Sequence, residues 1–168
     1  MVESNISEDE EISEQEGPRN ILITDLIKEI ERANYQHSKY SILLDKTAAA
    51  SVYFGHKATL KDFHKETIAV TLGRKQKSDA MEVLRKGLIY AMKYGDTLCI
   101  HVDKTVPDFK SMWTSDEFPT ADIFNFEEFH KRVNYLKVVS EEENIDIYGN
   151  KGMYVMHKDF RLVILATW

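Results

Sequence analysis

The stretch from Ser78 to Asp103 decides how this chain folds. It reads SDAMEVLRKGLIYAMKYG over residues 78–95 and DTLCIHVD over residues 96–103. Apolar residues recur at helical spacing in the first part, which predicts a helix with one buried stripe. These residues are Met81, Leu84, Leu88 and Met92. We expect Ser78 to cap this helix and Gly95 to end it in a left-handed turn.

The second part of this stretch predicts a buried strand. Residues 98–102 are almost uninterruptedly apolar, which is typical of a strand that is covered on both faces of a parallel sheet. Asp103 follows at its carboxyl end, where open α/β sheets bind their ligands.

Length and composition indicate one globular domain. The 168 residues are 43% hydrophobic and 30% charged, which suffices for one core. The single cysteine, Cys99, rules out an internal disulfide and favours a reducing compartment. No apolar run approaches the roughly 18 residues that span a bilayer. The polar, acidic N-terminus is unlike a signal peptide. We therefore expect a cytoplasmic protein with no membrane partner.

The negative charge of the chain lies in its first residues. Residues 1–20 hold seven acids and one base, a net charge of -6 that equals the net charge of the whole chain. We interpret residues 1–19 as an acidic disordered tail, which either solvates the protein or attracts a basic partner. Residues 20–168 form the predicted domain. It carries no excess of basic residues, which argues against a nucleic-acid partner.

Helical and strand patterns alternate along this domain, which predicts the α/β class with a mainly parallel sheet. We expect helices over residues 21–36 (capped by Asn20 or Thr24), 46–54 and from Asn125 onward, where Glu128 completes a capping box. We expect strands over residues 40–44, 67–72, 154–156 and 160–166. Residues 141–152 predict a loop or hairpin that turns near Gly149 and Asn150.

Three further motifs follow one another at plausible spacing. Leu43-Leu44-Asp45 precedes KTAAAS (46–51), YAMKYG (90–95) precedes a buried strand, and KDFR (158–161) precedes LVILAT (162–167). Together these residues resemble the ATP-binding dynein motor region, the fifth AAA module of dynein heavy chains. The same block resembles, in a more degenerate form, the C-terminal part of IQ-motif and ankyrin-repeat proteins. The resemblance covers residues 40–168 and implies a P-loop NTPase/AAA-like three-layer sandwich.

The chain departs from a working nucleotide site in several places. A phosphate-binding loop reads G-x-x-x-x-G-K-[ST], because its backbone amides must close around the phosphates. Residues 40–54 contain no glycine, and Asp45 stands directly before Lys46 and Thr47. Lys104 follows Asp103 at the position where AAA enzymes have a glutamate. Because the chain stops at Trp168, we also expect the helical lid of AAA modules to be missing. The resemblance therefore implies a degenerate module.

Three residues remain as vestigial nucleotide-site candidates. Lys46 and Thr47 would contact phosphate, and Asp103 would hold magnesium. The alternatives are an ordinary helix start for the first two residues and a turn cap or lysine pair for Asp103. We expect no catalytic residue, no metal site and no cofactor; ATP or ADP with magnesium is the alternative.

Other residues have competing interpretations. Cys99 and His101 are two positions apart in a strand and therefore share a face. They are either core residues or part of a Cys-His-Asp nucleophile arrangement. Trp113 and Phe118 are interface anchors or cover an edge of the sheet. The basic loop at residues 73–77 is solvated, or contacts the acidic tail or a partner.

These observations predict a non-catalytic structural or interaction protein, not an enzyme. The resemblance implies association with the cytoskeleton or cilium and a protein partner at microtubules or the axoneme. The sheet would serve as a docking surface, with its exposed edges covered by a partner or by another copy. One alternative is an ATP/ADP-binding protein or weak ATPase of the AAA class. Another is a folded fragment of a longer protein.

Overall fold

The computed structural model describes residues 18–167. The acidic tail expected over residues 1–19 therefore lies almost wholly outside the described residues. At the start of the described part, Arg19 forms an ion pair with Glu29 at 2.9 Å.

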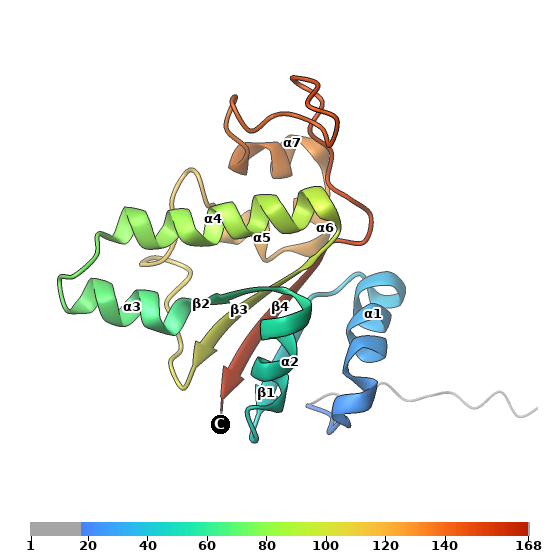
Figure 1. Cartoon of the computed structure of the whole chain (residues 1–168), viewed down its shortest axis with the longest axis vertical. Coiled ribbons are helices and arrows are strands. Elements are labelled where there is room, and N and C mark those ends of the chain that lie inside the picture. The colour runs from blue at the N-terminus through green and yellow to red at the C-terminus, as the bar shows by residue number, and fades with distance from the viewer. Residues whose placement is uncertain (1–17, 168) are drawn as a thin grey trace, which may run out of the picture.

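Four parallel strands form the described sheet, which confirms the α/β prediction (Figure 1). They are β1 (Ser41–Asp45), β2 (Thr59–Asp62), β3 (Thr97–Asp103) and β4 (Arg161–Thr167). Their order across the sheet is β1-β4-β3-β2. The last strand in sequence thus lies in the interior of the sheet, between the first strand and the Asp103-bearing strand.

The apolar runs of β3 and β4 alternate between two hydrophobic clusters, because successive side chains of a strand point to opposite faces. Leu98 and Ile100 join one cluster, while Cys99, Val163 and Leu165 join the other. Both faces of these two central strands are therefore buried, as their continuous apolar sequence predicts.

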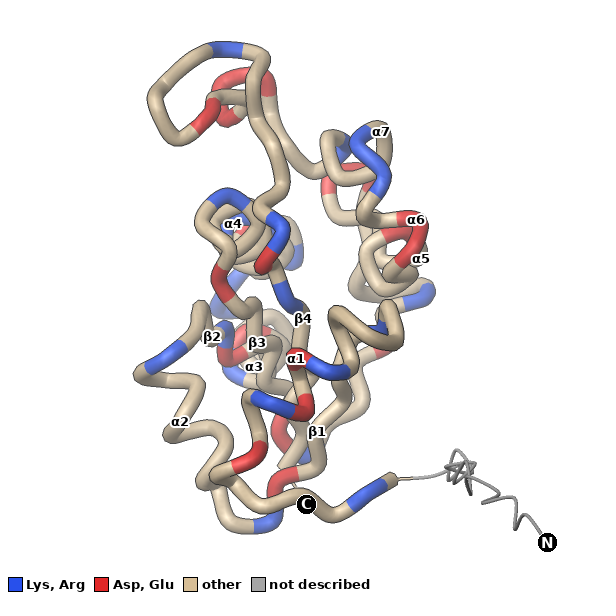
Figure 2. The backbone as a smooth tube through the Cα atoms, turned by 90° about the vertical axis from the view of Figure 1, so that its right-hand side faces the viewer, with Lys and Arg blue, Asp and Glu red and all other residues tan. Residues whose placement is uncertain are grey.

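Helices cover both faces of the sheet, so that the domain has three layers (Figures 1 and 2). One face packs against α1 (Leu26–His37) and α2 (Ala49–Lys57). The other packs against α3 (Phe63–Thr71), α4 (Lys77–Tyr94), α5 (Thr120–Ile123), α6 (Phe126–Phe129) and α7 (Arg132–Tyr135). Two short 3-10 turns, Ile23–Asp25 and Leu136–Val138, complete the described elements.

Helix α4 is present where the sequence predicts it, but its start differs. It begins at Lys77 after Gln76, and no side chain caps it, so the expected Ser78 cap is wrong. Its end is as predicted, because Gly95 has a φ of +70°. The ring of His157 packs so closely on Gly95 that a Cβ there would collide with it.

The strand predicted over residues 67–72 is wrong. Most of this segment belongs to α3, and the strand that joins the sheet lies earlier, at β2. Asp62 starts α3 by accepting the backbone N–H of Lys65, and Phe63 anchors the helix in the core. Thr67, Ile68, Val70 and Thr71 favour strands when considered alone, but strand preference depends on context, and this cap and anchor override it here.

The N-terminal caps expected for the first helix are also wrong. Neither Asn20 nor Thr24 caps it, since Asp25 precedes α1 without a side-chain hydrogen bond. The second helix begins three residues later than predicted, at Ala49, because the Asp45 side chain shapes the intervening turn.

The segment after β3 is only partly as predicted. Asn125 caps α6 by accepting the N–H of Glu128, as expected, but the helix stops at Phe129. The amide of Asn134 donates to the Glu128 carbonyl and separates α6 from α7. The 141–152 hairpin is confirmed by an antiparallel bridge between Ile145 and Lys151.

The strand expected over residues 154–156 is wrong. These residues form no strand, and Tyr154 is buried and donates its hydroxyl to the Ile89 carbonyl of α4. Of the two interpretations of Trp113 and Phe118, burial in the core excludes exposed interface anchors and leaves cover for an edge of the sheet.

Candidate functional site at the carboxyl ends of the strands

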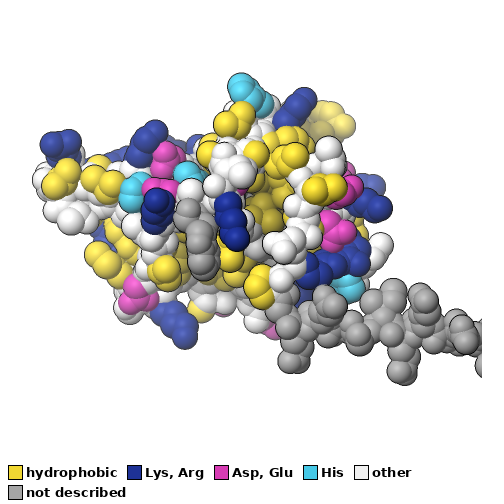
Figure 3. Space-filling view, turned by 90° about the horizontal axis from the view of Figure 1, so that it is seen from below, with side chains coloured by type: hydrophobic (Ala, Val, Ile, Leu, Met, Phe, Trp, Pro, Cys, Tyr) yellow, Lys and Arg dark blue, Asp and Glu magenta, His cyan; other side chains and the backbone are white. Residues whose placement is uncertain are grey.

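The candidate residues meet at one edge of the sheet, where all four strands end. Lys46 and Thr47 follow β1, Asp103 ends β3, and Thr167 ends β4 between them. Figure 3 views the molecule from this side and shows histidine, acidic and basic side chains together with hydrophobic ones on this face. Sequence reasoning therefore places Lys46, Thr47 and Asp103 at a common edge, the usual ligand-binding edge of a parallel sheet.

Asp45 organises the turn between β1 and α2. Its Oδ1 accepts the backbone N–H of Thr47 at 2.9 Å and the Thr47 hydroxyl at 3.1 Å. Its Oδ2 accepts the backbone N–H of Ala50 at 2.8 Å, in the first turn of α2. The side chain thus fills the amide positions at the helix N-terminus, where an anion would otherwise bind.

The environment of Asp45 holds it in the charged form. The residue is only 8% exposed, and burial alone would raise the pKa of its carboxyl. The hydrogen bonds from Thr47 and Ala50 outweigh burial and bring the pKa below its ordinary value. The turn therefore contains a fixed negative charge at neutral pH.

Ala48 lies in the same turn with a left-handed backbone, at φ +61°. A residue with a Cβ pays roughly 1 kcal/mol for this conformation, which glycine adopts freely. The turn thus has a backbone conformation that is typical of glycine, although the residue at this position is Ala48.

Asp103 faces a histidine that the sequence analysis did not select. Its Oδ2 lies 3.6 Å from Nε2 of His64, near the start of α3. The pairing of β3 with β4 shifts register between His101 and Asp103, and Asp103 has a φ of +51°. This irregularity accompanies the contact between Asp103 and α3.

His101 and Cys99 occupy different surroundings along β3. His101 Nε2 lies 3.1 Å from the Thr167 hydroxyl, so these two side chains form a hydrogen bond across neighbouring strands. The Cys99 thiol is fully buried, and burial raises its pKa to about 12. A thiol that stays protonated and out of reach of solvent agrees with the core interpretation of Cys99.

Sequence reasoning missed two features of this edge, the capping role of Asp45 and the contact of His64. Asp45 is recognisable as a carboxylate two residues before a threonine at the end of a strand, which is a common side-chain turn pattern. His64 had no comparable signal, because the β2–α3 junction was not predicted.

Within residues 18–167, no set of three or more His, Cys, Asp or Glu side chains is arranged to hold a metal ion.

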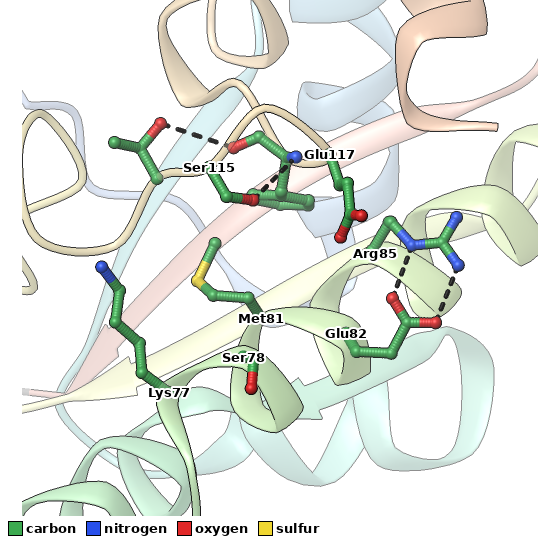
Figure 4. A pocket seen from close by; sticks show the side chains of 9 residues that line it. Lys77, Ser78, Met81, Glu82, Arg85, Ser115 and Glu117 are labelled. Carbon is green, nitrogen blue, oxygen red and sulfur yellow. Dashed lines mark hydrogen bonds and ion pairs between the residues drawn. The ribbon is translucent and has the colours of Figure 1, made fainter. Parts of the chain in front are cut away.

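A separate cavity of about 230 Å³ lies beside the N-terminal half of α4 (Figure 4). Met81 and Phe118 line it, together with polar groups that include Lys77 and Glu117. Arg85 at its end is already held by two carboxylates: Glu82 at 2.5 Å and Glu143 at 2.6 Å. None of the nucleotide-site candidates lines this cavity.

The basic loop at residues 73–77 is partly engaged within the domain, because Lys75 forms an ion pair with Glu66 of α3.

In the described part of the chain, no helix is both long and apolar enough to cross a membrane. A scan against protein-family models finds no match, and no curated protein or solved structure matches this chain.

Proposed function

We propose that this protein is a non-catalytic structural or interaction protein built on a degenerate nucleotide-binding fold. The observation that carries the proposal is the Asp45 carboxylate, which accepts the backbone amides of Thr47 and Ala50 at the start of α2. These amides are the groups that a phosphate would need at this edge.

A phosphate would meet both steric and electrostatic opposition here. It would have to displace a carboxylate that already accepts three hydrogen bonds in this turn. If the carboxylate stayed, two negative charges about 4 Å apart would repel by about 4 kcal/mol at the effective dielectric of a protein surface. This cost opposes nucleotide binding at Lys46 and Thr47.

The arrangement of the strands supports descent from a nucleotide-binding fold of the P-loop or AAA type. Such a site needs the loop after the first strand, an acidic strand end and a polar residue on the strand between them. Asp45–Thr47, Asp103 and Thr167 occupy these places along one edge. The dynein-like identity, a microtubule or axoneme partner and the cytoskeletal or ciliary setting remain predictions of the sequence resemblance.

The alternative is an ATP- or ADP-binding protein or a weak ATPase, with Asp103 holding magnesium. Isothermal titration of the full chain with ATP and ADP, with and without magnesium, separates the two functions. We expect no heat of binding at millimolar nucleotide. Micromolar binding that is lost in Asp103→Ala and kept in Asp108→Ala, an exposed loop carboxylate, would overturn the non-catalytic proposal.

A further inference from the structure

The cavity of about 230 Å³ beside α4 is lined by two separate elements. Lys77, Ser78 and Met81 belong to the first turns of α4, whereas Ser115 and Phe118 belong to the loop before α5. None of the candidate residues at the carboxyl ends of the strands lines this cavity. A ligand bound here would therefore not touch the nucleotide-site candidates.

Both walls of the cavity are ordered by contacts within the described chain. Met81 is 5% exposed and Phe118 is fully buried, so the apolar part of the cavity belongs to the hydrophobic core. In the loop, the backbone N–H of Phe118 donates to the Ser115 hydroxyl at 3.1 Å, and that of Thr120 donates to the Thr114 hydroxyl at 3.3 Å. The cavity is therefore preformed, and a ligand would not first have to order its walls.

Two charged side chains of the cavity have no partner within residues 18–167. Neither the Lys77 ammonium group nor the Glu117 carboxylate forms an ion pair or a hydrogen bond there. Arg85, the other base that lines the cavity, is already held by two carboxylates. Figure 4 shows Lys77 and Glu117 on opposite sides of Met81. The cavity therefore offers one positive and one negative group with an apolar side chain between them.

We propose that this cavity binds a small linear zwitterion of the ω-amino acid class. Such a molecule has a carboxylate at one end of a short hydrocarbon chain and an ammonium group at the other. The carboxylate pairs with Lys77, the ammonium group pairs with Glu117, and the hydrocarbon chain lies against Met81 and Phe118. A ligand with a single charge would satisfy only one of the two charged side chains, and an apolar ligand would satisfy neither.

The volume of the cavity limits the size of the ligand. Water takes about 30 Å³ per molecule in the liquid, so 230 Å³ corresponds to roughly eight water molecules. δ-Aminovalerate, with about eight non-hydrogen atoms, is a probe of this size. Lys77 and Glu117 are exposed, and ion pairs at exposed positions contribute little. We therefore expect a dissociation constant of about 1 mM for this probe.

Nuclear magnetic resonance of the full chain, titrated with δ-aminovalerate to tens of millimolar, tests this inference. We expect saturating shifts of the backbone amides of Ser78, Ser115 and Phe118, which lie in the two walls of the cavity. Valerate and pentylamine are the matched probes, because each keeps the hydrocarbon chain but only one of the two charges. Each should bind about three-fold more weakly than δ-aminovalerate, because it loses one ion pair.

Charge-reversal variants test the two ion pairs directly. Lys77→Glu and Glu117→Lys should each weaken the binding of δ-aminovalerate about five-fold, because an attraction becomes a repulsion. The double variant should bind more tightly than either single variant, because a reversed ligand again finds both partners. The matched controls are Lys110→Glu and Glu127→Lys, which change exposed charges outside the cavity and should leave binding unchanged.

Three results would overturn the inference. They are a wild type without saturating shifts, equal binding of all three probes, and a double variant that binds no better than the single ones. The inference does not rest on the proposed function. Since no nucleotide-site candidate lines the cavity, none of these results affects the nucleotide titration, and the two proposals are judged separately.

Discussion

Asp45 Oδ2 accepts the backbone N–H of Ala50 at 2.8 Å, and this contact joins the end of the first strand to the first turn of the next helix. It places a negative charge where a nucleotide-binding fold would receive a phosphate. The same contact orders the turn, because it satisfies amides that would otherwise lack a partner. The residue that we propose opposes nucleotide binding is thus also a structural residue.

Replacing Asp45 should destabilise the domain. Asp45→Ala leaves the amides of Thr47 and Ala50 without their acceptor, and loss of a helix cap typically costs about 1–2 kcal/mol. Chemical denaturation measures this loss in the free energy of unfolding. The control is Asp108→Ala, which removes similar turn hydrogen bonds from an exposed loop and should change stability little. Equal effects in both variants would contradict the special role of Asp45.

The stabilising effect of Asp45 should depend on pH. The pKa of Asp45 is lower in the folded protein than its ordinary value of about 3.9, so its contribution is complete above that value. The contribution is lost as the pH falls through the lower pKa of the folded state. Thermal unfolding of wild type and Asp45→Asn between neutral pH and about pH 3 should give a difference that shrinks at acid pH. A difference that is constant across this range would show that the Asp45 charge is unimportant.

Ala48→Gly should stabilise the protein. The left-handed φ of +61° costs alanine roughly 1 kcal/mol, while the greater freedom of glycine in the unfolded chain offsets part of this gain. We expect a net gain of about 0.5 kcal/mol in the free energy of unfolding. Ala33→Gly, inside α1, is the matched control and should lose about 1 kcal/mol. If both variants lose stability equally, Ala48 is not strained.

Gly95→Ala should be strongly destabilising. The φ of +70° disfavours any side chain, and a Cβ would also collide with the His157 ring. We expect a loss of more than 2 kcal/mol, above the cost of roughly 1–2 kcal/mol for the backbone alone. His157→Ala should rescue part of the loss in the double variant, because it removes the collision. Strict additivity of the two losses would contradict this close packing.

Arg85 should hold the segment after α7 against α4. Its Nη1 donates to the Val138 carbonyl at 2.8 Å and to Glu143 at 2.6 Å. Arg85→Ala should cost about 2–4 kcal/mol, because a partly buried carboxylate loses its partner. Hydrogen exchange over residues 136–145 should accelerate in this variant but not in Lys86→Ala, an exposed neighbour. Unchanged exchange in Arg85→Ala would show that other contacts hold the segment.

The predictions from sequence succeeded where burial alone determines structure. Residues 162–165 are apolar without interruption, and residues 98–102 are interrupted by His101 alone. Such runs belong to the covered centre of a parallel sheet. The predictions failed at the β2 edge of the sheet, whereas the opposite edge strand, β1, lies where the sequence predicted a strand over residues 40–44. β2 has the mixed sequence TLKD, which carries no strand pattern, whereas the β-branched run at residues 67–71 lies in a helix fixed by Asp62 and Phe63.

The candidate site was predictable in position but not in chemistry. The carboxyl ends of parallel strands meet at one edge, so Lys46, Thr47 and Asp103 could be placed there from the strand pattern. The hydrogen bond from the Ala50 amide to Asp45 could not be predicted from the sequence, because it depends on how the turn folds back. The contact of Asp103 with His64 likewise depends on a helix that the sequence did not predict.

The proposed function requires the Asp45 carboxylate to occupy the place of a phosphate. The most direct test is nuclear magnetic resonance of the backbone amides of Thr47 and Ala50 during titration of the full chain with ATP and magnesium. We expect both amide signals to stay in place up to millimolar nucleotide. Saturating shifts of these two signals at micromolar ATP, absent in Asp103→Ala, would contradict it and define a working nucleotide site.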